Sequence, residues 1–295
     1  MNNRWLETIV FIRVAESGSF SRAARELGLS QPSTSRIVTG LETRLGVKLL
    51  LRTTRNIALT EAGAVFLEGA RRASTELEEV EDVARGIDSL RGTIRLAVPV
   101  MYGSRVVIPA LASFLERYPD LRVEITMRDE RQNLVAAGID LAIRMGTLED
   151  STFGARQISS VPRMLVASPA YLAKKGAPNT PEELALHDAL LHEQSFGEKS
   201  TLKLCQAGAE WIVTLHGRIK IDSASGILAA ATAGLGIANV TTIMSAQERS
   251  DGSLIQLLPD YELEPLEAFA VFPSGPRPSA KVRALVTHLI DVLGN

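Results

Sequence analysis

Cysteine and histidine, the residues that most often build redox and metal sites, are scarce in this chain of 295 residues. Its one cysteine, Cys205, excludes an internal disulfide and a cysteine-pair redox switch, and it suits a reducing compartment. Its four histidines have no metal-ligand spacing. The sequence also contains no GxSxG, Walker A or dinucleotide-binding fingerprint. We therefore predict no catalytic residues, no metal and no cofactor, and we interpret each histidine as a surface or structural residue.

Long apolar runs are absent too. No run approaches the roughly 20 residues that a membrane-spanning helix requires, and residues 1–5 lead directly into an amphipathic helix rather than a signal peptide. With 45% apolar residues, a chain of this length can form two or three packed units. The sequence thus predicts a cytoplasmic protein with no membrane partner.

Charge is unevenly distributed along a chain whose net charge is -2. Residues 1–60 hold nine Lys and Arg against four Asp and Glu, which gives a net charge of +5. Positive charge concentrated on one small domain is typical of nucleic-acid binding. Few aromatic residues lie among these basic side chains, so the pattern favours reading a duplex groove over stacking on single strands.

Two short helices separated by a glycine turn are predicted within this basic segment. Ser21 is the expected N-cap of a helix over 22–27, and Gly28 supplies the left-handed residue that ends it. Ser30 is placed to cap the next helix, whose first turn accommodates Pro32 without losing a hydrogen bond. This layout is typical of a helix-turn-helix, whose second helix enters the major groove.

The second helix has one apolar and one polar face. The apolar stripe, which should face the core, consists of Thr34, Ile37, Val38, Leu41 and Leu45. The opposite face is slim and rich in hydroxyl groups, and Arg36 is its one guanidinium, which suits base edges and phosphates. Such a face on a lone helix is more often merely solvated, so the surrounding charge and the segment that follows decide in favour of DNA.

A basic hairpin follows the second helix. Residues 47–51 and 57–59 resemble two short strands around a turn, with Arg52 and Arg55 at the tip. Guanidinium groups at the tip of a wing are placed to contact the DNA backbone. We predict a winged helix-turn-helix for duplex DNA over residues 1–60.

Residues 11–63 resemble, without a gap, the amino-terminal half of a LysR-type transcriptional regulator, and the run from Ala23 and Ala24 through 59–63 (LTEAG) is highly specific. The resemblance implies groove-facing residues on the second helix, namely Ser33, Ser35, Arg36 and Thr39. It implies wing contacts to phosphate from Arg52 and Arg55, with Thr53 between them.

Two residues depart from the family pattern. Thr34 stands where the family usually has a small apolar residue. We expect its hydroxyl to bond back to the preceding turn at a modest cost in stability, rather than to make a new base contact. Leu50 stands where the family commonly has Phe, a loss of volume that bears on the packing of the wing.

A heptad stripe begins directly behind this domain. Apolar residues recur at alternating spacings of four and three, at Phe66, Ala70, Ala73, Leu77, Val80, Ala84 and Ile87. The stripe predicts a coiled-coil helix over 61–90, where eight acidic residues against three arginines disfavour DNA contact. On the pattern alone, the stripe can also pack against its own domain. The resemblance implies a dimerisation helix, and therefore two reading heads on a two-fold-related operator.

Beyond Arg91 and Gly92 the chain alternates between strand and helix patterns. Strands are predicted over 93–98, 121–127, 138–144, 164–167, 219–221 and 236–240, and helices over 105–116, 132–137, 170–174 and 225–233. This alternation favours mostly parallel sheets covered by helices, arranged as two lobes with a cleft between them. The resemblance implies a periplasmic-binding-protein-like effector domain over 91–295. Lobe I then spans about 91–163 and 268–295, and lobe II about 164–267.

Small ligands of such sheets lie beyond the carboxyl ends of strands. Applied here, this rule selects a loop at 99–104, the turns at 127–129 and 144–146, and the segment 222–225. Hydroxyl groups beside backbone N–H groups at these places favour an anionic ligand. The predicted effector-binding residues are Val100, Met101, Ser104, Arg128, Arg144, Ser223, Asn239 and Thr241.

Several of these assignments have a structural alternative. An arginine at a strand end, as Arg128 and Arg144 are, is more often a surface or ion-pair residue. Asn239 and Thr241 stand where an apolar strand is expected. Their partner is either a ligand or, with equal weight, an internal hydrogen bond.

Together these features predict a sequence-specific DNA-binding transcriptional regulator that combines α+β and α/β domains and responds to a small ligand between two lobes. The resemblance implies a homodimer, and then a homotetramer, on an interrupted palindromic operator in double-stranded DNA, with RNA polymerase as a further candidate partner. The alternative is a soluble solute-binding protein, or an enzyme on the same scaffold, whose front domain only oligomerises. DNA binding by variants at Arg36 and Arg52 separates the two hypotheses.

Overall fold

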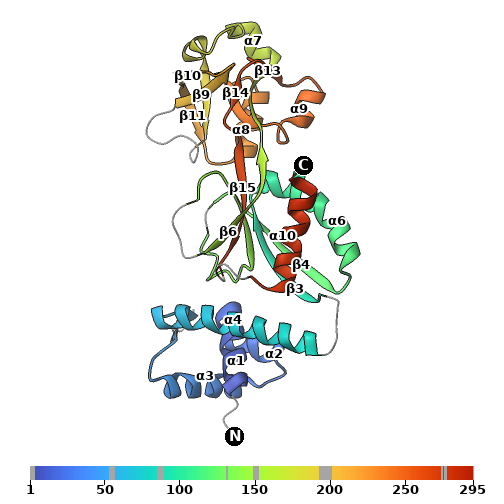
Figure 1. The fold of residues 1–295 in the computed structure, drawn as a ribbon. Helices are drawn as coiled ribbons and strands as arrows, with labels where there is room; N and C mark the ends of the chain where they lie inside the picture. The colour runs from blue at the N-terminus through green and yellow to red at the C-terminus, as the bar shows by residue number, and fades with distance from the viewer. Residues whose placement is uncertain are drawn as a thin grey trace.

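Three bodies follow one another along the chain in the computed structural model (Figure 1). It describes residues 4–52, 57–84, 90–130, 132–148, 153–192, 201–273, 275 and 278–294. A helical domain at the N-terminus is followed by a lobe that contains β3 (Gly92–Val98) and by a second lobe that contains β12 (Ile237–Thr241). Within the described residues, no helix has the length and apolar character needed to cross a bilayer.

Three helices and a hairpin form the N-terminal domain. They are α1 (Arg4–Ser17), α2 (Phe20–Glu26), α3 (Gln31–Leu45), β1 (Leu50–Arg52) and β2 (Ile57–Leu59). Ser30 caps α3 as predicted, because its hydroxyl accepts from the N–H of Ser33 at 3.3 Å. The predicted cap of α2 was wrong: Ser19 has the extended backbone of a cap and accepts from the N–H of Arg22, whereas Ser21 lies inside the helix. The first strand begins at Leu50 rather than at Val47.

The core of this domain contains the apolar stripe of α3. Val38 and Leu41 are fully buried against Val10 and Phe11 of α1. Thr34 is also fully buried, and its hydroxyl donates to the carbonyl of Ser30 at 3.1 Å, as predicted. Leu50 and the neighbouring wing residue Leu49 belong to the same cluster. The wing is therefore packed onto the core at its base.

Helix α4 (Glu61–Ala84) divides the heptad stripe between two environments. Its first half packs on its own domain: Ala70 is buried, and the ring of Phe66 meets that of Phe11 with centroids 5.3 Å apart. The second half is exposed, with Leu77 39% and Val80 64% accessible. The coiled-coil seam predicted from Phe66 onward was therefore wrong for its first two residues, because they pack in the core of the N-terminal domain. Ile87 lies outside the described residues, and so does the side chain of Ala84.

The first lobe is built on a five-stranded sheet in the order β4-β3-β5-β15-β6. The other strands are β4 (Leu121–Met127), β5 (Leu141–Met145), β6 (Gly154–Val161) and β15 (Leu266–Phe272). Strands β3, β4 and β5 are parallel, whereas β15 runs antiparallel to both of its neighbours. Helices α6 (Ile108–Arg117) and α10 (Ala280–Leu293) cover one face, where their apolar residues join the buried cluster around Leu96 and Phe114.

Two expectations for this lobe were wrong. The segment predicted as a loop at 99–104 is helical: α5 (Val100–Tyr102) continues through the π-helical turn η1 (Gly103–Val107) into α6. Gly103 does not break the helix, because its N–H donates to the carbonyl of Pro99 as in a helix. The helix predicted over 132–137 is only a set of turns, with Gly138 at positive φ closing it.

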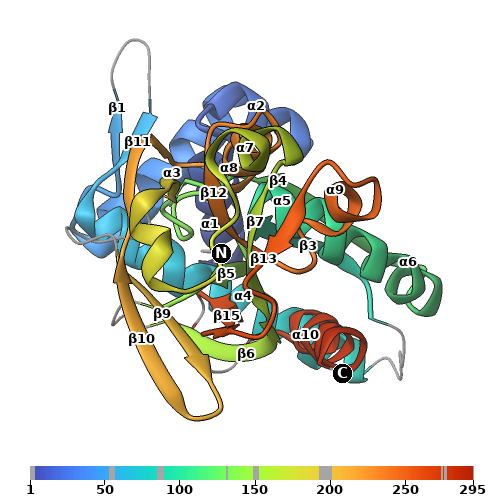
Figure 2. The same cartoon turned by 90° about the horizontal axis from the view of Figure 1, so that it is seen from above.

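The second lobe also has a five-stranded mixed sheet, in the order β11-β8-β12-β7-β13. Its strands besides β12 are β7 (Arg163–Ala167), β8 (Asp188–His192), β11 (His216–Ile221) and β13 (Ile255–Leu257). Its helical segments are α7 (Pro169–Lys175), η2 (Glu182–Leu186), α8 (Ala224–Thr232) and α9 (Ala246–Ser250). A smaller sheet of β10 (Ala209–Thr214), β9 (Thr201–Gln206) and β14 (Glu262–Leu263) joins it, and its β9–β10 hairpin stands out from the body (Figure 2).

The chain crosses between the lobes twice. It leaves the first sheet at Val161 and enters the second at Arg163, and it returns between Leu263 and Leu266. Apolar clusters pack on both faces of the second sheet, one around Leu165 and the other around Val166. Because the strands β8, β11 and β12 are parallel, their carboxyl ends lie at one edge of this sheet.

Candidate DNA-binding face and ligand cavity

The exposed face of α3 carries the residues predicted to meet the groove. Arg36 and Thr39 are exposed, and Ser33 and Ser35 are half-buried at its flanks. The Ser33 hydroxyl lies 2.8 Å from that of Ser30, which places it at the start of the helix. The structure therefore brings these four residues onto the side of α3 that faces away from the core.

Arg36 is the available cation of this face. Its side chain is exposed, and it makes no ion pair with any residue that the structure describes. By contrast, Arg44 on the same helix pairs with Glu7 at 2.8 Å and is occupied within the fold. An uncommitted guanidinium offers its fork of donors to a guanine edge or a phosphate.

The base of the wing is well defined. Strands β1 and β2 pair antiparallel, and Arg52 lies opposite Ile57. Arg52 is the last residue of β1. Its side chain lies outside the described residues, as do Thr53 and Arg55. Their predicted contacts to phosphate remain predictions.

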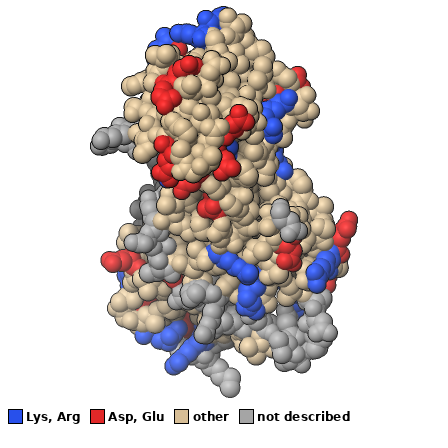
Figure 3. Space-filling view, turned by 45° about the horizontal axis from the view of Figure 1, so that its top comes forward, with Lys and Arg blue, Asp and Glu red and all other residues tan. Residues whose placement is uncertain are grey.

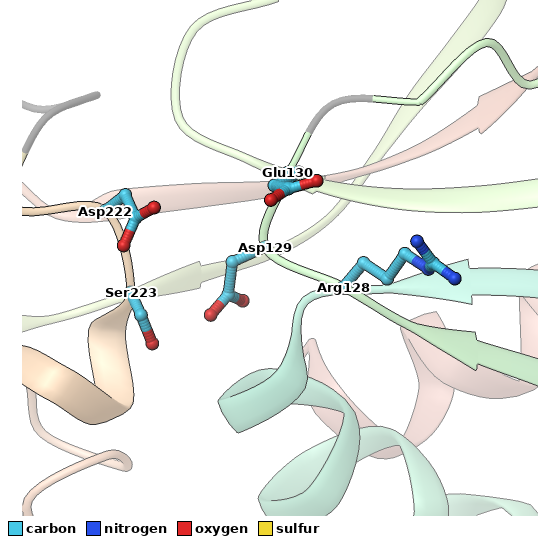
Figure 4. Close-up of a pocket in the computed structure, with 5 residues that line it drawn as sticks. All are labelled: Arg128, Asp129, Glu130, Asp222 and Ser223. Carbon is cyan, nitrogen blue, oxygen red and sulfur yellow. The ribbon is translucent and has the colours of Figure 1, made fainter.

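A cavity of about 320 Å³ lies between the lobes. It is lined by Arg128, Asp129, Glu130, Asp222 and Ser223. The first three follow the carboxyl end of β4, and the last two follow that of β11, so the rule of strand ends located it. Asp129 and Ser223 face each other across the space, whereas the guanidinium of Arg128 extends away from it (Figure 4).

The charge of this cavity differs from the expectation. Among the residues that the structure describes, three carboxylates line it against one guanidinium, and their net charge is negative. On the face shown in Figure 3, acidic side chains gather on the upper body close to its junction with the lower one. The segments selected from the sequence contain Asp129 and Asp222, but the hydroxyl groups and arginines beside them favoured an anionic ligand in the prediction. No group of three or more His, Cys, Asp and Glu suited to a metal ion occurs in the part of the chain that is described.

Only two of the eight predicted effector residues, Arg128 and Ser223, line the cavity. The Ser223 hydroxyl already accepts from the N–H of Gly226 and lies 2.7 Å from that of Ser225. Ser104 is helical, and its hydroxyl donates to the carbonyl of Met101. The hydroxyl groups of both serines therefore form hydrogen bonds with nearby backbone groups, as serines within or at the ends of helices commonly do.

The other predicted effector residues belong to packing or to the sheets. The N–H of Val100 donates to a carboxylate oxygen of Asp129 at 2.9 Å, and Met101 packs against the apolar cluster of lobe II. Arg144 is half-buried on β5. The hydroxyl of Thr241 accepts from the N–H of Met244, an internal hydrogen bond. Asn239 differs, because its Oδ1 is buried and accepts no hydrogen bond from the described residues.

An ion pair that sequence reasoning missed joins the two lobes. Arg105 in η1 donates to both carboxylate oxygens of Glu248 in α9, at 2.9 and 3.2 Å. It also donates to the carbonyl of Met244. The hydrogen bonds from Arg105 outweigh burial and lower the pKa of Glu248. No local signal predicts this pair, since its partners lie 143 residues apart in the sequence.

Both domains match families of known proteins. Residues 6–64 match the family described as bacterial regulatory helix-turn-helix protein, lysR family, and residues 88–294 match the LysR substrate binding domain. The chain belongs to the LysR family. It is accordingly a DNA-binding transcriptional regulator whose second domain binds an effector, and the predicted fold class and family are confirmed.

Relatives of this LysR-family chain are similar over most of their length. The HTH-type transcriptional regulator CrgA of Neisseria meningitidis serogroup B is 33% identical, with 98% of this chain and 97% of CrgA covered. The HTH-type transcriptional activator AaeR of Escherichia coli K12 is also 33% identical, with 96% and 91% covered. The full-length structure of the virulence activator AphB of Vibrio cholerae is 28% identical, covers 97% of this chain and 98% of AphB, and has a TM-score of 0.57.

Proposed function

We propose that this LysR-family regulator holds duplex DNA with the exposed face of α3 and with the wing. The groove contacts are assigned to Ser33, Ser35, Arg36 and Thr39, and the phosphate contacts to Arg52, Thr53 and Arg55. The observation that carries the proposal is the uncommitted guanidinium of Arg36, opposite the core-facing stripe of the helix. We further assign the DNA-binding domain to 1–60, the linker helix to 61–90, and the effector domain to 91–295 with lobe II between about 164 and 267.

A gel-shift assay tests this assignment. Arg36→Ala should weaken binding by about 1–3 kcal/mol and alter base preference, whereas Arg52→Ala should weaken binding to all sequences similarly. Arg122→Ala is the matched control, because this exposed arginine of β4 lies on the effector domain. Unchanged affinity in both head variants would reject these contacts.

Two copies of the chain are proposed to pair through the second half of α4. Its exposed stripe of Ala73, Leu77 and Val80 is apolar and lies beyond the part that packs on the domain core. A dimer of this kind places two reading heads on an interrupted palindrome. Membership of the LysR family is the ground for four further proposals. They are tetramer formation, contact with RNA polymerase, a location in the cytoplasm with the chromosome, and the lack of catalytic activity.

The effector is proposed to lie in the cavity between the lobes and to carry positive charge. The support is the described part of the lining, where Asp129, Glu130 and Asp222 outnumber Arg128, whose guanidinium turns away. A carboxylate effector would meet like charges at short range, whereas an amine or a guanidinium would meet opposite ones. Because these carboxylates do not form a metal-binding group, an organic cation is favoured over a metal ion.

A thermal-shift comparison of matched ligands tests the sign of the effector's charge. Small amines should raise the melting temperature of the full chain, and carboxylic acids of the same carbon skeleton should not, since a ligand stabilises only the state it binds. Asp222→Asn should reduce the shift, and Asp260→Asn, an exposed change that does not line the cavity, should not. Stabilisation by acids alone would reverse the assignment.

A further inference from the structure

We propose that Glu42 is a positioning residue for DNA binding, whose carboxylate fixes the base of the wing to the recognition helix α3. The proposal rests on the proposed phosphate contact of Arg52. The Glu42 side chain is only 2% exposed. A carboxylate is seldom buried this far unless it is paired. Its position, one residue after the buried Leu41 on the core side of α3, keeps it away from the predicted groove contacts.

The carboxylate of Glu42 connects α3 to the start of β1. One oxygen, Oε1, accepts from the backbone N–H groups of Leu49 at 3.0 Å and Leu50 at 3.1 Å. The other, Oε2, accepts from Nζ of Lys48 at 2.8 Å. Leu50 opens the strand that ends at Arg52. One side chain of the recognition helix therefore holds the backbone two residues before the proposed phosphate contact.

The charged form of Glu42 is the form that the fold requires. Burial raises the pKa of this carboxyl, but the hydrogen bonds from Lys48 and from the N–H groups of Leu50 and Leu49 outweigh it, and the net pKa is lowered. Lys48 itself is 71% exposed. The two backbone donors therefore define the geometry, since an exposed lysine side chain restricts its partner little.

The opposite side of the same backbone segment is held by Thr60, the residue between β2 and α4. The N–H of Thr60 donates to the carbonyl of Leu49 at 3.0 Å, and the Thr60 hydroxyl donates to that of Lys48 at 2.7 Å. The hairpin also keeps its own ladder, from Leu50 opposite Leu59 to Arg52 opposite Ile57. Loss of Glu42 therefore removes the polar link between the wing and α3, while the apolar packing of Leu49 and Leu50, the bonds to Thr60 and the internal pairing of the hairpin remain.

This arrangement matters because α3 must contact the groove while the wing contacts phosphate on the same duplex. Phosphate contacts set the register in which a helix meets base edges. They do so only if the wing keeps one position relative to α3. The effect expected from releasing the wing is therefore the loss of its phosphate contact, beyond any change in stability.

The salt dependence of DNA binding measures this loss directly. The logarithm of DNA affinity falls linearly with the logarithm of salt concentration, and each phosphate contact adds about 0.9 to the magnitude of this slope. A fraction of inactive protein lowers the apparent affinity equally at every salt concentration and leaves the slope unchanged. The slope thus responds to lost contacts and not to a merely structural role. The probe is a labelled duplex of mixed sequence, about 40 base pairs long, which reports phosphate contacts without a known operator.

Four single variants of the full chain and one double variant are compared with Arg52→Ala. Glu42→Leu removes the acceptors at similar volume, and Glu42→Asp keeps the charge but shortens the reach, so it replaces the leucine variant if that one fails to fold. Glu42→Gln keeps an acceptor oxygen for both N–H groups and is the conservative rescue. Glu26→Leu, at an exposed position of α2, controls for removing one negative charge from the domain.

We expect Arg52→Ala to reduce the magnitude of the slope by about 0.9 for each head on the DNA. Glu42→Leu and Glu42→Asp should lower it equally, and the double variant of Glu42→Leu with Arg52→Ala no further, while Glu42→Gln and Glu26→Leu keep the wild-type slope. A wild-type slope in Glu42→Leu and Glu42→Asp, with a lowered slope in Arg52→Ala, overturns the role of Glu42. An unchanged slope in Arg52→Ala overturns the wing contact itself.

Discussion

Replacing Gly63 with alanine should destabilise the N-terminal domain, even though alanine is the better helix former. Gly63 lies in the first turn of α4, where its N–H donates to the Thr60 hydroxyl at 2.9 Å. A Cβ added there would lie 2.0 Å from the carbonyl oxygen of Leu49 and 2.9 Å from its carbonyl carbon. Ordinary contact begins at 3.4 Å. The start of α4 and the Leu49 backbone must therefore separate by more than about 1 Å.

The size of the effect follows from what holds Leu49 in place. Its side chain is 1% exposed in the core, and its N–H and carbonyl are bonded to Glu42 and Thr60. Forcing a group into such packing costs about 1–3 kcal/mol. The hydrogen bonds between Thr60 and its neighbours add about 1 kcal/mol each when they are broken. Alanine returns about 1 kcal/mol through helix propensity. We expect a net loss of about 3 kcal/mol.

Gly40→Ala is the matched control. Gly40 lies on α3 with no heavy atom within 4 Å of an added Cβ. The same substitution there should raise the free energy of unfolding by about 0.5–1 kcal/mol. The two tryptophans allow the N-terminal domain to be observed alone, because Trp5 lies in α1 and Trp211 lies in β10. Urea unfolding followed by Trp5 fluorescence, in a Trp211→Phe background, measures both variants.

Opposite signs for the two alanine variants are the decisive result. If Gly63→Ala unfolds at the same urea concentration as the parent, the close approach of α4 to Leu49 is wrong. If Gly63→Ala and Gly40→Ala both stabilise, helix propensity alone governs these sites, and the packing argument fails.

Three further changes test other parts of the fold. Thr34→Val should alter the free energy of unfolding by less than about 0.5 kcal/mol and leave DNA affinity unchanged, because the Ser30 carbonyl keeps its backbone donor; urea unfolding and a gel shift measure both. Arg105→Ala should destabilise the contact between the lobes by about 1–2 kcal/mol and speed hydrogen exchange in α9, while unchanged exchange would show that the pair with Glu248 is dispensable. Burial lowers the pKa of His187 below its ordinary 6.5, so stability should be constant above about pH 6.5 and fall as the pH drops through the depressed folded pKa. Unfolding followed by Trp211 fluorescence measures this stability at each pH. In His187→Gln the stability should fall less as the pH drops.

The sequence was most informative where one local pattern decides the structure. The N-cap at Ser30 and the apolar stripe of α3 depend on residues within a few turns of one another, and both were predicted correctly. Ser19 was overlooked in favour of Ser21 because two serines stand near the same helix start, and only the backbone distinguishes them. A glycine inside a helix, as at Gly103, resembles a loop residue when only the sequence is known.

Contacts between distant segments were beyond sequence reasoning. Phe66 and Ala70 fit a dimer seam as well as they fit a core, and the choice depends on α1 lying within reach. The pair of Arg105 with Glu248 depends on how two lobes meet. The strand-end rule selected two of the segments that line the cavity between the lobes, because it follows from sheet topology. It did not give the charge of the cavity, which depends on which side chains of a turn face inward.

The contacts of Leu49 also bear on how a signal from the effector domain reaches the DNA. Its backbone is tied to the recognition helix through Glu42 and also to Thr60, whose hydroxyl accepts from the N–H of Gly63 in the first turn of α4. The buried contacts of Phe66 and Ala70 continue the same junction into the core. Helix α4 and its head are thus expected to move as one body, since a packed core deforms little. A ligand between the lobes should then change the separation or tilt of two rigid heads, and leave the geometry between recognition helix and wing unchanged in each.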